Sequence, residues 1–279
     1  MSFRRIILGI ILLLVLNLMA WSFVAFKPFE TDAEAYFLDV GQGDSELVKA
    51  DGANFLIDSG KDQSVIENLE KIIPFYKKRI DIAFISHGQT DHAGGMFYLL
   101  KNFDVGTVIY NGDNTPLWQN LRRLLEEKEI PYVILKAGDS VSYKENRFQV
   151  LWPRSLSEKI GFNDNSMVIK YVNGIFSSLF TADISSKVET ELLREGADIK
   201  SDILKIPHHG SKYSSSQKFL EAVSSGAAVI EVGKNSYGHP TKEVLARIAE
   251  EGTKILRTDL DGIVKFDFFG GKIRISCLR

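Results

Sequence analysis

The chain has 279 residues with 34 basic and 36 acidic side chains, giving a formal net charge of −2 at pH 7. A quarter of the residues are charged and 44% are apolar, which excludes a disordered or fibrous protein. The single cysteine, Cys277, excludes an intrachain disulfide and a cysteine-rich zinc cluster. Histidine chemistry must therefore use five residues: His87, His92, His208, His209 and His239.

The first apolar segment covers residues 6–26, which carry no charge and follow Arg4 and Arg5. As a helix it would measure about 31 Å, enough for a bilayer core of about 30 Å. We expect a cytoplasmic stub and signal anchor at 1–27, a transmembrane helix, and a short linker at 28–34. The positive-inside rule then makes the protein single-pass, with its main domain outside the cytoplasmic membrane. The alternative is a cleaved signal peptide and a secreted protein, although such peptides usually have a shorter apolar core.

The part of the chain after residue 27 is more acidic than the whole. It carries 31 basic and 36 acidic residues, a net charge of −5. Non-specific nucleic-acid binding relies on a broad excess of positive charge, so this domain is not expected to bind nucleic acids in that way. A nucleic-acid substrate would need a local basic groove.

Short apolar runs in the first half of this domain alternate with amphipathic stretches. Apolar runs and alternation predict strands at 35–40, 46–49, 55–58, 82–85, 107–110, 132–135, 140–143 and 148–152. Helical spacing predicts helices at 64–76, 96–102 and 116–128, the last with Pro116 in its first turn.

The second half shows the same alternation of apolar runs and amphipathic stretches. Strands are predicted at 167–172, 175–180, 203–206, 227–232, 255–257, 262–268 and 272–277, with Asn173-Gly174 as a hairpin turn. Helices are predicted at 185–194, 216–223 and 241–250. Each half thus combines a sheet with flanking helices. Two such halves packed sheet to sheet predict an α/β fold over 35–279, a four-layer αββα sandwich.

Polar side chains gather where the predicted strands end. His87, Gln89, Asp91 and His92 follow the strand at 82–85 within six residues. Imidazole and carboxylate groups are the usual nitrogen and oxygen ligands of zinc, manganese and iron in proteins. The loop therefore favours a metal site, against the alternative of a polar loop with two incidental histidines.

Three further strand ends strengthen this hypothesis. Asp183 follows the strand at 175–180, where a carboxylate either binds a cation or caps the next helix. His208 and His209 follow the strand at 203–206, and His239 follows the strand at 227–232. All five histidines thus fall at strand-to-helix junctions, where open α/β sheets place their sites. Lys205, Lys212, Lys234 and Tyr237 are near the same loops and are candidates for contact with an anionic substrate.

The order of these motifs resembles the metallo-β-lactamase superfamily, and closely its ComEC-like branch of extracytoplasmic hydrolase domains. The segments that carry the resemblance are 37–45 (FLDVGQGDS), 56–60 (LIDSG), 86–95 (SHGQTDHAGG), 163–168 (NDNSMV), 181–184 (TADI), 204–211 (LKIPHHGS) and 233–240 (GKNSYGHP). Together they cover about residues 35–277. The resemblance implies the αββα fold and metal-assisted hydrolysis.

The resemblance also implies roles for individual residues. The expected metal ligands are His87, Gln89, Asp91, His92, Asp183 and His239, with Asp183 bridging two ions. Asp91 and His208 are the expected catalytic residues: Asp91 would hold the attacking water, and His208 would protonate the leaving oxygen or act as a ligand. Asp58 would orient a ligand histidine. Asn165, Ser166 and His209 would support the metal site or position substrate.

Two positions depart from the family pattern. Gln89 replaces a histidine and Ala182 replaces a glycine, and an amide is a weaker metal ligand than an imidazole. We therefore expect one or two divalent metal ions, zinc or manganese. The expected function is a phosphodiesterase that acts outside the cytoplasmic membrane on nucleic acid, such as DNA, or on a cell-envelope phosphodiester. Its partners would be the membrane and a separately encoded DNA-uptake channel. The alternatives are a catalytically silent binding module, because of Gln89, and an anchored structural domain.

Overall fold

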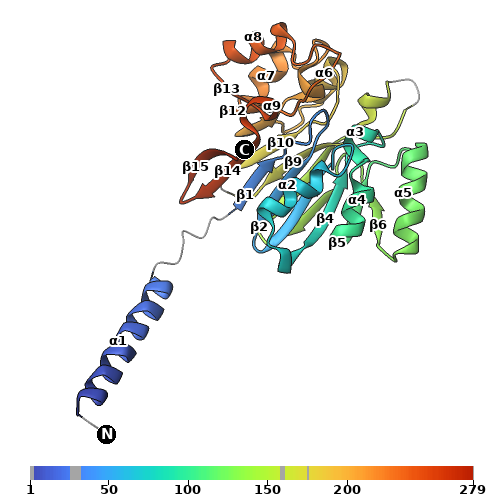
Figure 1. The fold of residues 1–279 in the computed structure, drawn as a ribbon. Coiled ribbons are helices and arrows are strands. Elements are labelled where there is room, and N and C mark those ends of the chain that lie inside the picture. The colour runs from blue at the N-terminus through green and yellow to red at the C-terminus, as the bar shows by residue number, and fades with distance from the viewer. Residues whose placement is uncertain (1–2, 26–32, 158–160, 175, 279) are drawn as a thin grey trace.

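The computed structural model describes residues 3–25, 33–157, 161–174 and 176–278. Helix α1 (Phe3–Ala25) comes first, and strand β1 (Ala33–Phe37) opens the main domain (Figure 1). Within the described ranges, none of the helices combines the length and the apolar character needed to cross a membrane. The transmembrane helix expected at 1–27 is thus not supported. Most of the expected linker at 28–34 falls on residues 26–32, outside the described residues.

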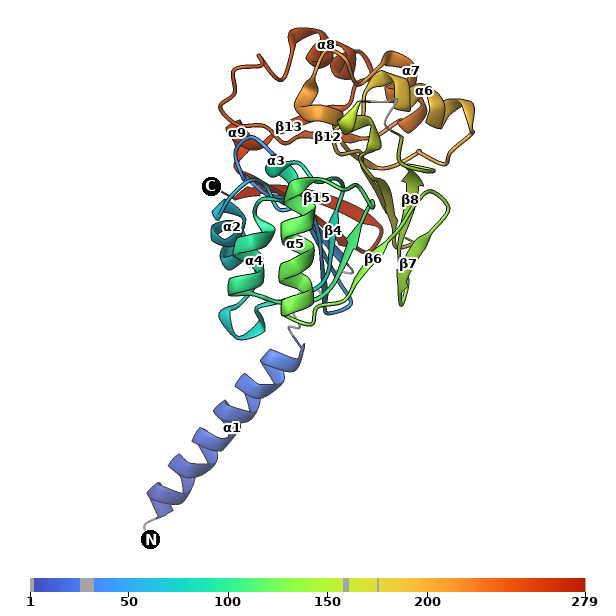
Figure 2. The same ribbon diagram turned by 90° about the vertical axis from the view of Figure 1, so that its right-hand side faces the viewer.

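The first sheet has the strand order β15-β14-β1-β2-β3-β4-β5-β6 in the described part of the chain. Its other strands are β2 (Glu46–Ala50), β3 (Ala53–Ile57), β4 (Arg79–Ile85), β5 (Asp104–Tyr110), β6 (Tyr132–Ile134), β14 (Ile263–Phe269) and β15 (Lys272–Leu278). Strands β3 to β6 run parallel, and the remaining pairs are antiparallel. Its outer face carries α2 (Ser64–Ile72), α4 (Met96–Asn102) and α5 (Pro116–Glu127) (Figure 2). The short helix α3 (Thr90–Ala93) and the 3-10 turn η1 (Phe75–Lys77) flank β4.

The second sheet has the order β13-β12-β11-β10-β9-β8-β7 among the residues placed. Its strands are β7 (Ser140–Tyr143), β8 (Asn146–Trp152), β9 (Val168–Val172), β10 (Ser177–Phe180), β11 (Ile203–Lys205), β12 (Ala227–Ile230) and β13 (Lys254–Arg257). Strands β10 to β13 run parallel. Its outer face carries α6 (Ser186–Arg194), α7 (Gln217–Val223) and α8 (Lys242–Glu250). The short elements are η2 (Phe162–Asn165), η3 (Pro207–Gly210) and α9 (Thr258–Asp261).

Three apolar cores hold the four layers together. The central core lies between the sheets, where the ring of Phe148 is 4.8 Å from those of Phe55 and Tyr171. Two outer cores pack the helices onto each sheet. Each fully buried large apolar side chain contributes about 1.5–3 kcal/mol relative to exposure. The four-layer αββα sandwich is therefore confirmed.

The two sheets are not two successive halves of the chain, as the sequence pattern had suggested. Strands β7 and β8, from the first half, belong to the second sheet, and β14 and β15 return to the first sheet beside β1. Strand patterns identify strands but not partners, because pairing depends on contacts distant in sequence. The helix expected at 64–76 ends at Ile72, since Pro74 forces Ile73 into extended backbone.

Candidate metal centre

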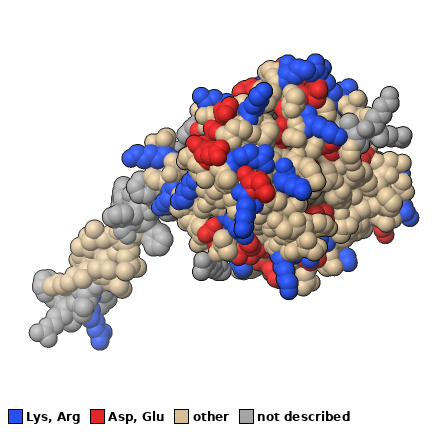
Figure 3. All heavy atoms as spheres, turned by 90° about the horizontal axis from the view of Figure 1, so that it is seen from above, with Lys and Arg blue, Asp and Glu red and all other residues tan. Residues whose placement is uncertain are grey.

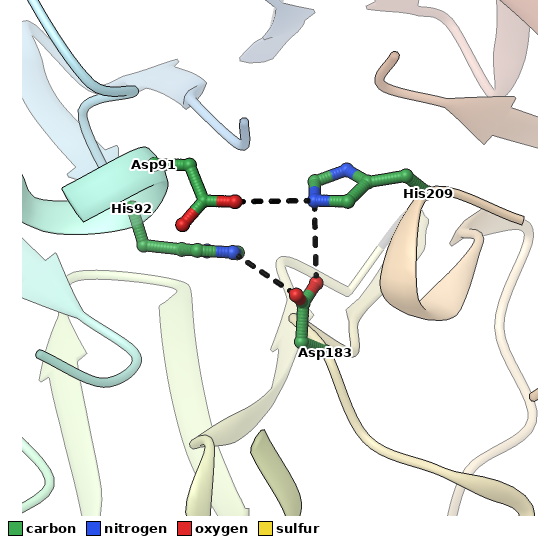
Figure 4. A group of neighbouring side chains, drawn as sticks. All are labelled: Asp91, His92, Asp183 and His209. Carbon is green, nitrogen blue, oxygen red and sulfur yellow. Dashed lines mark ion pairs between the residues drawn. The ribbon is translucent and has the colours of Figure 1, made fainter. Parts of the chain in front are cut away.

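The polar strand ends of both sheets meet at one seam of the sandwich. Asp91 and His92 lie on α3, just after β4, and Asp183 follows β10 of the second sheet. His209 lies in η3, after β11. Figure 4 shows these four side chains pointing toward one another from the two sheets. We call Asp91, His92, Asp183 and His209 the metal cluster.

One ligand atom from each member of the metal cluster lies within 4.8 Å of the others. His92 Nε2 is 3.4 Å from Asp183 Oδ2, and His209 Nε2 is 3.6 Å from Asp183 Oδ1 (Figure 4). His209 Nε2 is also 3.8 Å from Asp91 Oδ2. Ligand atoms that each lie about 2.1 Å from one tetrahedral ion are about 3.4 Å apart. The spacing therefore suits a single ion shared by the cluster.

Unpartnered buried atoms provide a test of whether a metal fits. His92 Nε2, His209 Nε2 and Asp183 Oδ1 are buried and have no hydrogen-bond partner among the residues that the structure describes. Such a group costs about 1–3 kcal/mol when nothing satisfies it. A cation would satisfy all three at once, and a set of imidazoles and carboxylates suits divalent transition metals. The residues present thus fit a divalent metal ion.

The outer nitrogens of the two imidazoles are held by fixed acceptors. His92 Nδ1 lies 2.9 Å from Asp58 Oδ2, and Asp58 also accepts hydrogen bonds from the Ser86 backbone at 2.8 Å and hydroxyl at 2.6 Å. His209 Nδ1 lies 2.8 Å from the Glu231 carbonyl oxygen. A carbonyl oxygen only accepts, so His209 Nδ1 donates. Each Nε2 is therefore the atom turned toward the cluster, as in histidines that bind metals.

The charges around the cluster shift the pKa values of its imidazoles and of Asp183. Burial alone would lower the pKa of His209, but Asp183 and Asp44 outweigh it and raise that pKa to about 10. The same balance raises the pKa of His92 above its ordinary value. Burial would raise the pKa of Asp183, but His209 and His92 lower it well below its ordinary value. Without a metal, the cluster is thus a network of ion pairs whose protons a bound cation would replace.

His87 and Gln89 occupy the neighbouring position, where the resemblance implies another ion. His87 is buried, its Nε2 has no hydrogen-bond partner in the described ranges, and its ring is 4.3 Å from that of His92. Burial, then His92, lowers the pKa of His87 to about 3, so the ring is neutral. The Gln89 amide donates to Asn163 Oδ1 at 2.5 Å. This position therefore offers one imidazole nitrogen without a hydrogen-bond partner among the described residues, and Asn163 holds the nitrogen of the Gln89 amide.

His208 and His239 lie at the rim. The His208 side chain is 30% exposed, and its Nε2 is 3.8 Å from Asp183 Oδ2. The His239 ring lies 5.7 Å from the His208 ring, outside the metal cluster, and Tyr237 stacks on it. Burial lowers the pKa of both imidazoles. The structure thus places His209 among the facing donor atoms and His239 away from them, whereas the sequence interpretation gave His239 the ligand role.

Left-handed backbone gathers around the site. His208, His209, Ala182 and Asp58 all have a positive φ, between 45° and 54°. Such conformations cost about 1–3 kcal/mol each in non-glycine residues and cluster at functional sites. Gly43 has a φ of 144°, and a Cβ there would lie 2.2 Å from the Asp91 carbonyl oxygen. The loop before β2 can therefore pack onto α3 only with glycine at this position.

The sequence interpretation did not single out Asn163, which the structure places at the site. Asn163 donates toward Asp183 Oδ2 at 3.5 Å and lies 3.3 Å from His208 Nε2. Asn165 instead bonds the Ser157 backbone at 3.0 Å, and Ser166 Oγ donates to the Asn163 carbonyl. The 163–168 motif contains two asparagines, and its letters do not say which one faces the site.

Asp44 and Lys205 lie beneath the metal cluster. Asp44 belongs to the 37–45 segment. Its position directly after Gly41-Gln42-Gly43 is the one feature of the sequence that could have marked it as a site residue. Lys205 is fully buried, so the expected contact with substrate is wrong for this residue. Lys212 and Tyr237 are exposed.

Comparison with known proteins agrees with this geometry. Residues 38–233 match the family model described as Metallo-beta-lactamase superfamily. The chain is 29% identical over 259 residues to "ComE operon protein 3" of Bacillus subtilis (strain 168), covering 85% of this chain and 33% of that protein. It is 33% identical over 268 residues to "Competence protein ComA" of Neisseria gonorrhoeae, covering 92% of this chain and 36% of that protein. The chain thus spans about a third of the length of these curated relatives.

Solved structures share the fold at low sequence identity. The metallo-beta-lactamase fold protein YhfI from Bacillus subtilis superposes with a TM-score of 0.61 at 11% identity, covering 84% of this chain and 99% of that one. Igni18, a metallo hydrolase from Ignicoccus hospitalis, gives a TM-score of 0.57 at 13% identity, covering 84% and 99%. The motif order, the αββα sandwich and these matches show that the chain belongs to the metallo-beta-lactamase superfamily, as a ComEC-like member.

Proposed function

We propose that this chain is a metal-dependent phosphodiesterase that acts outside the cytoplasm on nucleic acid or on a cell-envelope phosphodiester. The observation that carries the proposal is the metal cluster, in which three buried donor atoms face one another without hydrogen-bond partners in the described ranges. The residues proposed to hold zinc or manganese are Asp91, His92, Asp183 and His209. The metal, when bound, would supply a nucleophilic hydroxide and neutralise phosphate charge.

The side chains in and around the cluster have separate proposed roles in binding water, transferring a proton and orienting the ligands. Asp91 is 33% exposed, so its carboxylate can hold the attacking water through a hydrogen bond. His208 lies at the exposed rim, and it is the group proposed to give a proton to the leaving oxygen when its imidazole is protonated. His92 and His209 are held by Asp58 and the Glu231 carbonyl, which keeps their ring orientation fixed.

A cavity beside the site offers room for the organic part of a substrate. Its volume is about 780 Å³, and Asn114, Leu156 and Phe162 are among its lining residues. The Phe162 ring lies 5.8 Å from the His87 ring, so the cavity adjoins the site.

Exposed aromatic rings and a positive charge lie close in the chain to His208 and His239. Tyr213 is 68% exposed and Tyr237 is 73% exposed. The Lys212 ammonium lies 5.1 Å from the Tyr213 ring centre. Elsewhere, the face seen in Figure 3 intermixes basic and acidic side chains. This face therefore offers an anionic substrate no broad positive surface.

The names of the relatives favour DNA among the phosphodiesters. One curated relative is named "Competence protein ComA" and another "ComE operon protein 3". This supports the proposal that the substrate is DNA and that the partner is a DNA-uptake channel encoded separately. A cell-envelope phosphodiester remains the alternative substrate within the same chemistry.

Hydrolysis of bis(p-nitrophenyl) phosphate tests the proposal. We expect a chelator to abolish hydrolysis, added zinc or manganese to restore it, and Asp183→Asn to lower it by at least about 100-fold. The matched control is Asp198→Asn, since Asp198 is 74% exposed and pairs with Lys170 instead. Full activity in the Asp183→Asn variant or in the metal-free protein would overturn the proposal.

One observation favours a second candidate, a catalytically silent binding module. Gln89 stands where the family has a histidine, and its amide is bonded to Asn163. Such a module would bind substrate without cleaving it. It would gain hydrolysis when Gln89→His supplies the second imidazole.

A further inference from the structure

The side chain of Lys205 lies fully buried beneath the metal cluster, and the proposed hydrolysis does not use it. Its ammonium contacts the Asp44 carboxylate and donates to the Ala182 carbonyl at 2.9 Å. It also lies 3.9 Å from Asp183 Oδ1. Lys205 thus links the end of β11 to the loop before β2 and to the turn that carries Asp183.

Asp44 connects this ammonium to both imidazoles of the cluster. Its Oδ1 lies 3.3 Å from His209 Nδ1, and its Oδ2 lies 3.5 Å from His92 Nδ1. Asp44 is thus a charged neighbour common to both Nδ1 atoms, whose hydrogen bonds go to Asp58 and to the Glu231 carbonyl oxygen. Asp44 is fully buried, so solvent cannot take over this role.

The buried carboxyl groups around Asp44 explain why this part of the protein needs the positive charge of Lys205. Glu46 and Glu231 lie beside Asp44, and both are fully buried. Burial raises the pKa of both glutamates, and the neighbouring Asp44 carboxylate raises both further. The Lys205 ammonium lies against the Asp44 carboxylate and 3.9 Å from Asp183 Oδ1, so it faces carboxylates on two sides. Lys205 therefore supplies the charge that lets Asp44 stay ionised inside the protein.

We propose that Lys205 and Asp44 form a positioning pair whose charge, added to the hydrogen bonds from Asp58 and the Glu231 carbonyl, supports His92 and His209 in their ligand orientation and thereby sets metal affinity. The inference rests on the proposed metal centre. Partners that orient ligand histidines typically change metal affinity by about 10–100-fold when they are removed. A pair with a purely structural role would change the stability of the fold and leave the affinity of the folded protein unaltered.

Zinc titration into the chelator-treated full chain tests the pair. The affinity is read by competition with a chromophoric chelator, and circular dichroism reports folding. We expect Lys205→Met to weaken zinc binding by about 10–100-fold. The matched control is Lys170→Met, because Lys170 is also buried and ion-paired, to Asp198, and lies outside the cluster. This control is expected to bind zinc as the wild type does.

The double variant Lys205→Met/Asp44→Asn keeps the test decisive if the single variant does not fold. A neutral pair leaves no uncompensated buried charge, so the double variant is expected to fold. It should still bind zinc at least about tenfold more weakly, because an amide lacks the negative charge that Asp44 presents to both imidazoles. Wild-type affinity in a folded variant would overturn the inference. Failure of the wild type itself to bind zinc or manganese would instead overturn the proposed metal centre.

Discussion

His92 Nε2 lies 3.4 Å from Asp183 Oδ2, and this contact joins helix α3 of the first sheet to the end of β10 in the second. A metal bound at this seam would link the two halves of the sandwich. Ligands that bind only the folded state stabilise it by about 2.7 kcal/mol at 100 times their dissociation constant. The site is thus coupled to the stability of the whole domain.

Metal is therefore expected to raise the melting temperature. For a domain of this size, we expect saturating zinc to raise the melting temperature of the chelated protein by roughly 5–10 °C in calorimetry. Asp183→Asn should abolish the shift, since it removes the residue shared by both imidazoles. An unchanged melting temperature in the wild type would show that the cluster binds no ion.

His209 and His239 are expected to differ when each is replaced by alanine. His209→Ala removes a nitrogen of the metal cluster, so zinc affinity should fall by at least about 100-fold. His239→Ala should leave zinc affinity within about threefold, because His239 lies outside the cluster. Competition titration of the two variants measures both values. A larger loss of zinc affinity in His239→Ala would show that His239 is a metal ligand, as the sequence interpretation predicted.

Gln89→His is expected to complete the position beside His87. The His87 Nε2 atom lacks a hydrogen-bond partner in the part of the chain described, and a second imidazole would give it a neighbouring ligand. Elemental analysis should show about one additional equivalent of metal. Gln89→Ala is the control and should gain none. The same metal content in both variants would mean that this position does not hold an ion.

Glu34 gives the domain a pH-dependent contribution to stability away from the site. Its carboxylate lies 3.0 Å from Lys49 and 2.8 Å from Lys265. Burial alone would raise the pKa of Glu34, but Lys265 and Lys49 lower it below its ordinary value of 4.5. A carboxyl whose pKa is lowered in the folded state stabilises the fold above its unfolded pKa, and this stabilisation is lost as the pH falls through the folded value.

Glu34→Gln should therefore lower the free energy of unfolding by about 0.5–1 kcal/mol at pH 7, and by progressively less toward roughly pH 3. Urea unfolding of both proteins across this range measures the difference. A difference that does not vary with pH would contradict the ion-pair explanation.

The sequence predicted the layers of the fold better than the partners of its strands. Apolar periodicity is a local property, so most strands and helices could be located from it, and Met96–Asn102 matches its predicted helix in full. The pairing of β14 with β1 joins residues more than two hundred positions apart, such as Ala33 and Phe268. No local pattern specifies such a pairing, and this is why the exchange of strands between the two halves was not foreseen.

The site shows the same division between local and long-range information. Parallel strands end at the same edge of a sheet, so the cluster of polar strand ends could be predicted. The choice between His208 and His209 depends on two consecutive left-handed residues in η3, which turn one imidazole inward and leave the other at the rim. Asp44 and Lys205 come from segments 161 residues apart, and their contact follows only from the packing of the two sheets.

The metal content of the purified full chain tests the central claim most directly. Elemental analysis of the wild type and of Asp183→Asn, after dialysis against zinc or manganese, measures bound ions per chain. We expect at least one equivalent in the wild type and less than about a tenth of an equivalent in the variant. Less than half an equivalent of any transition metal in the wild type, or equal content in the two proteins, would contradict the account.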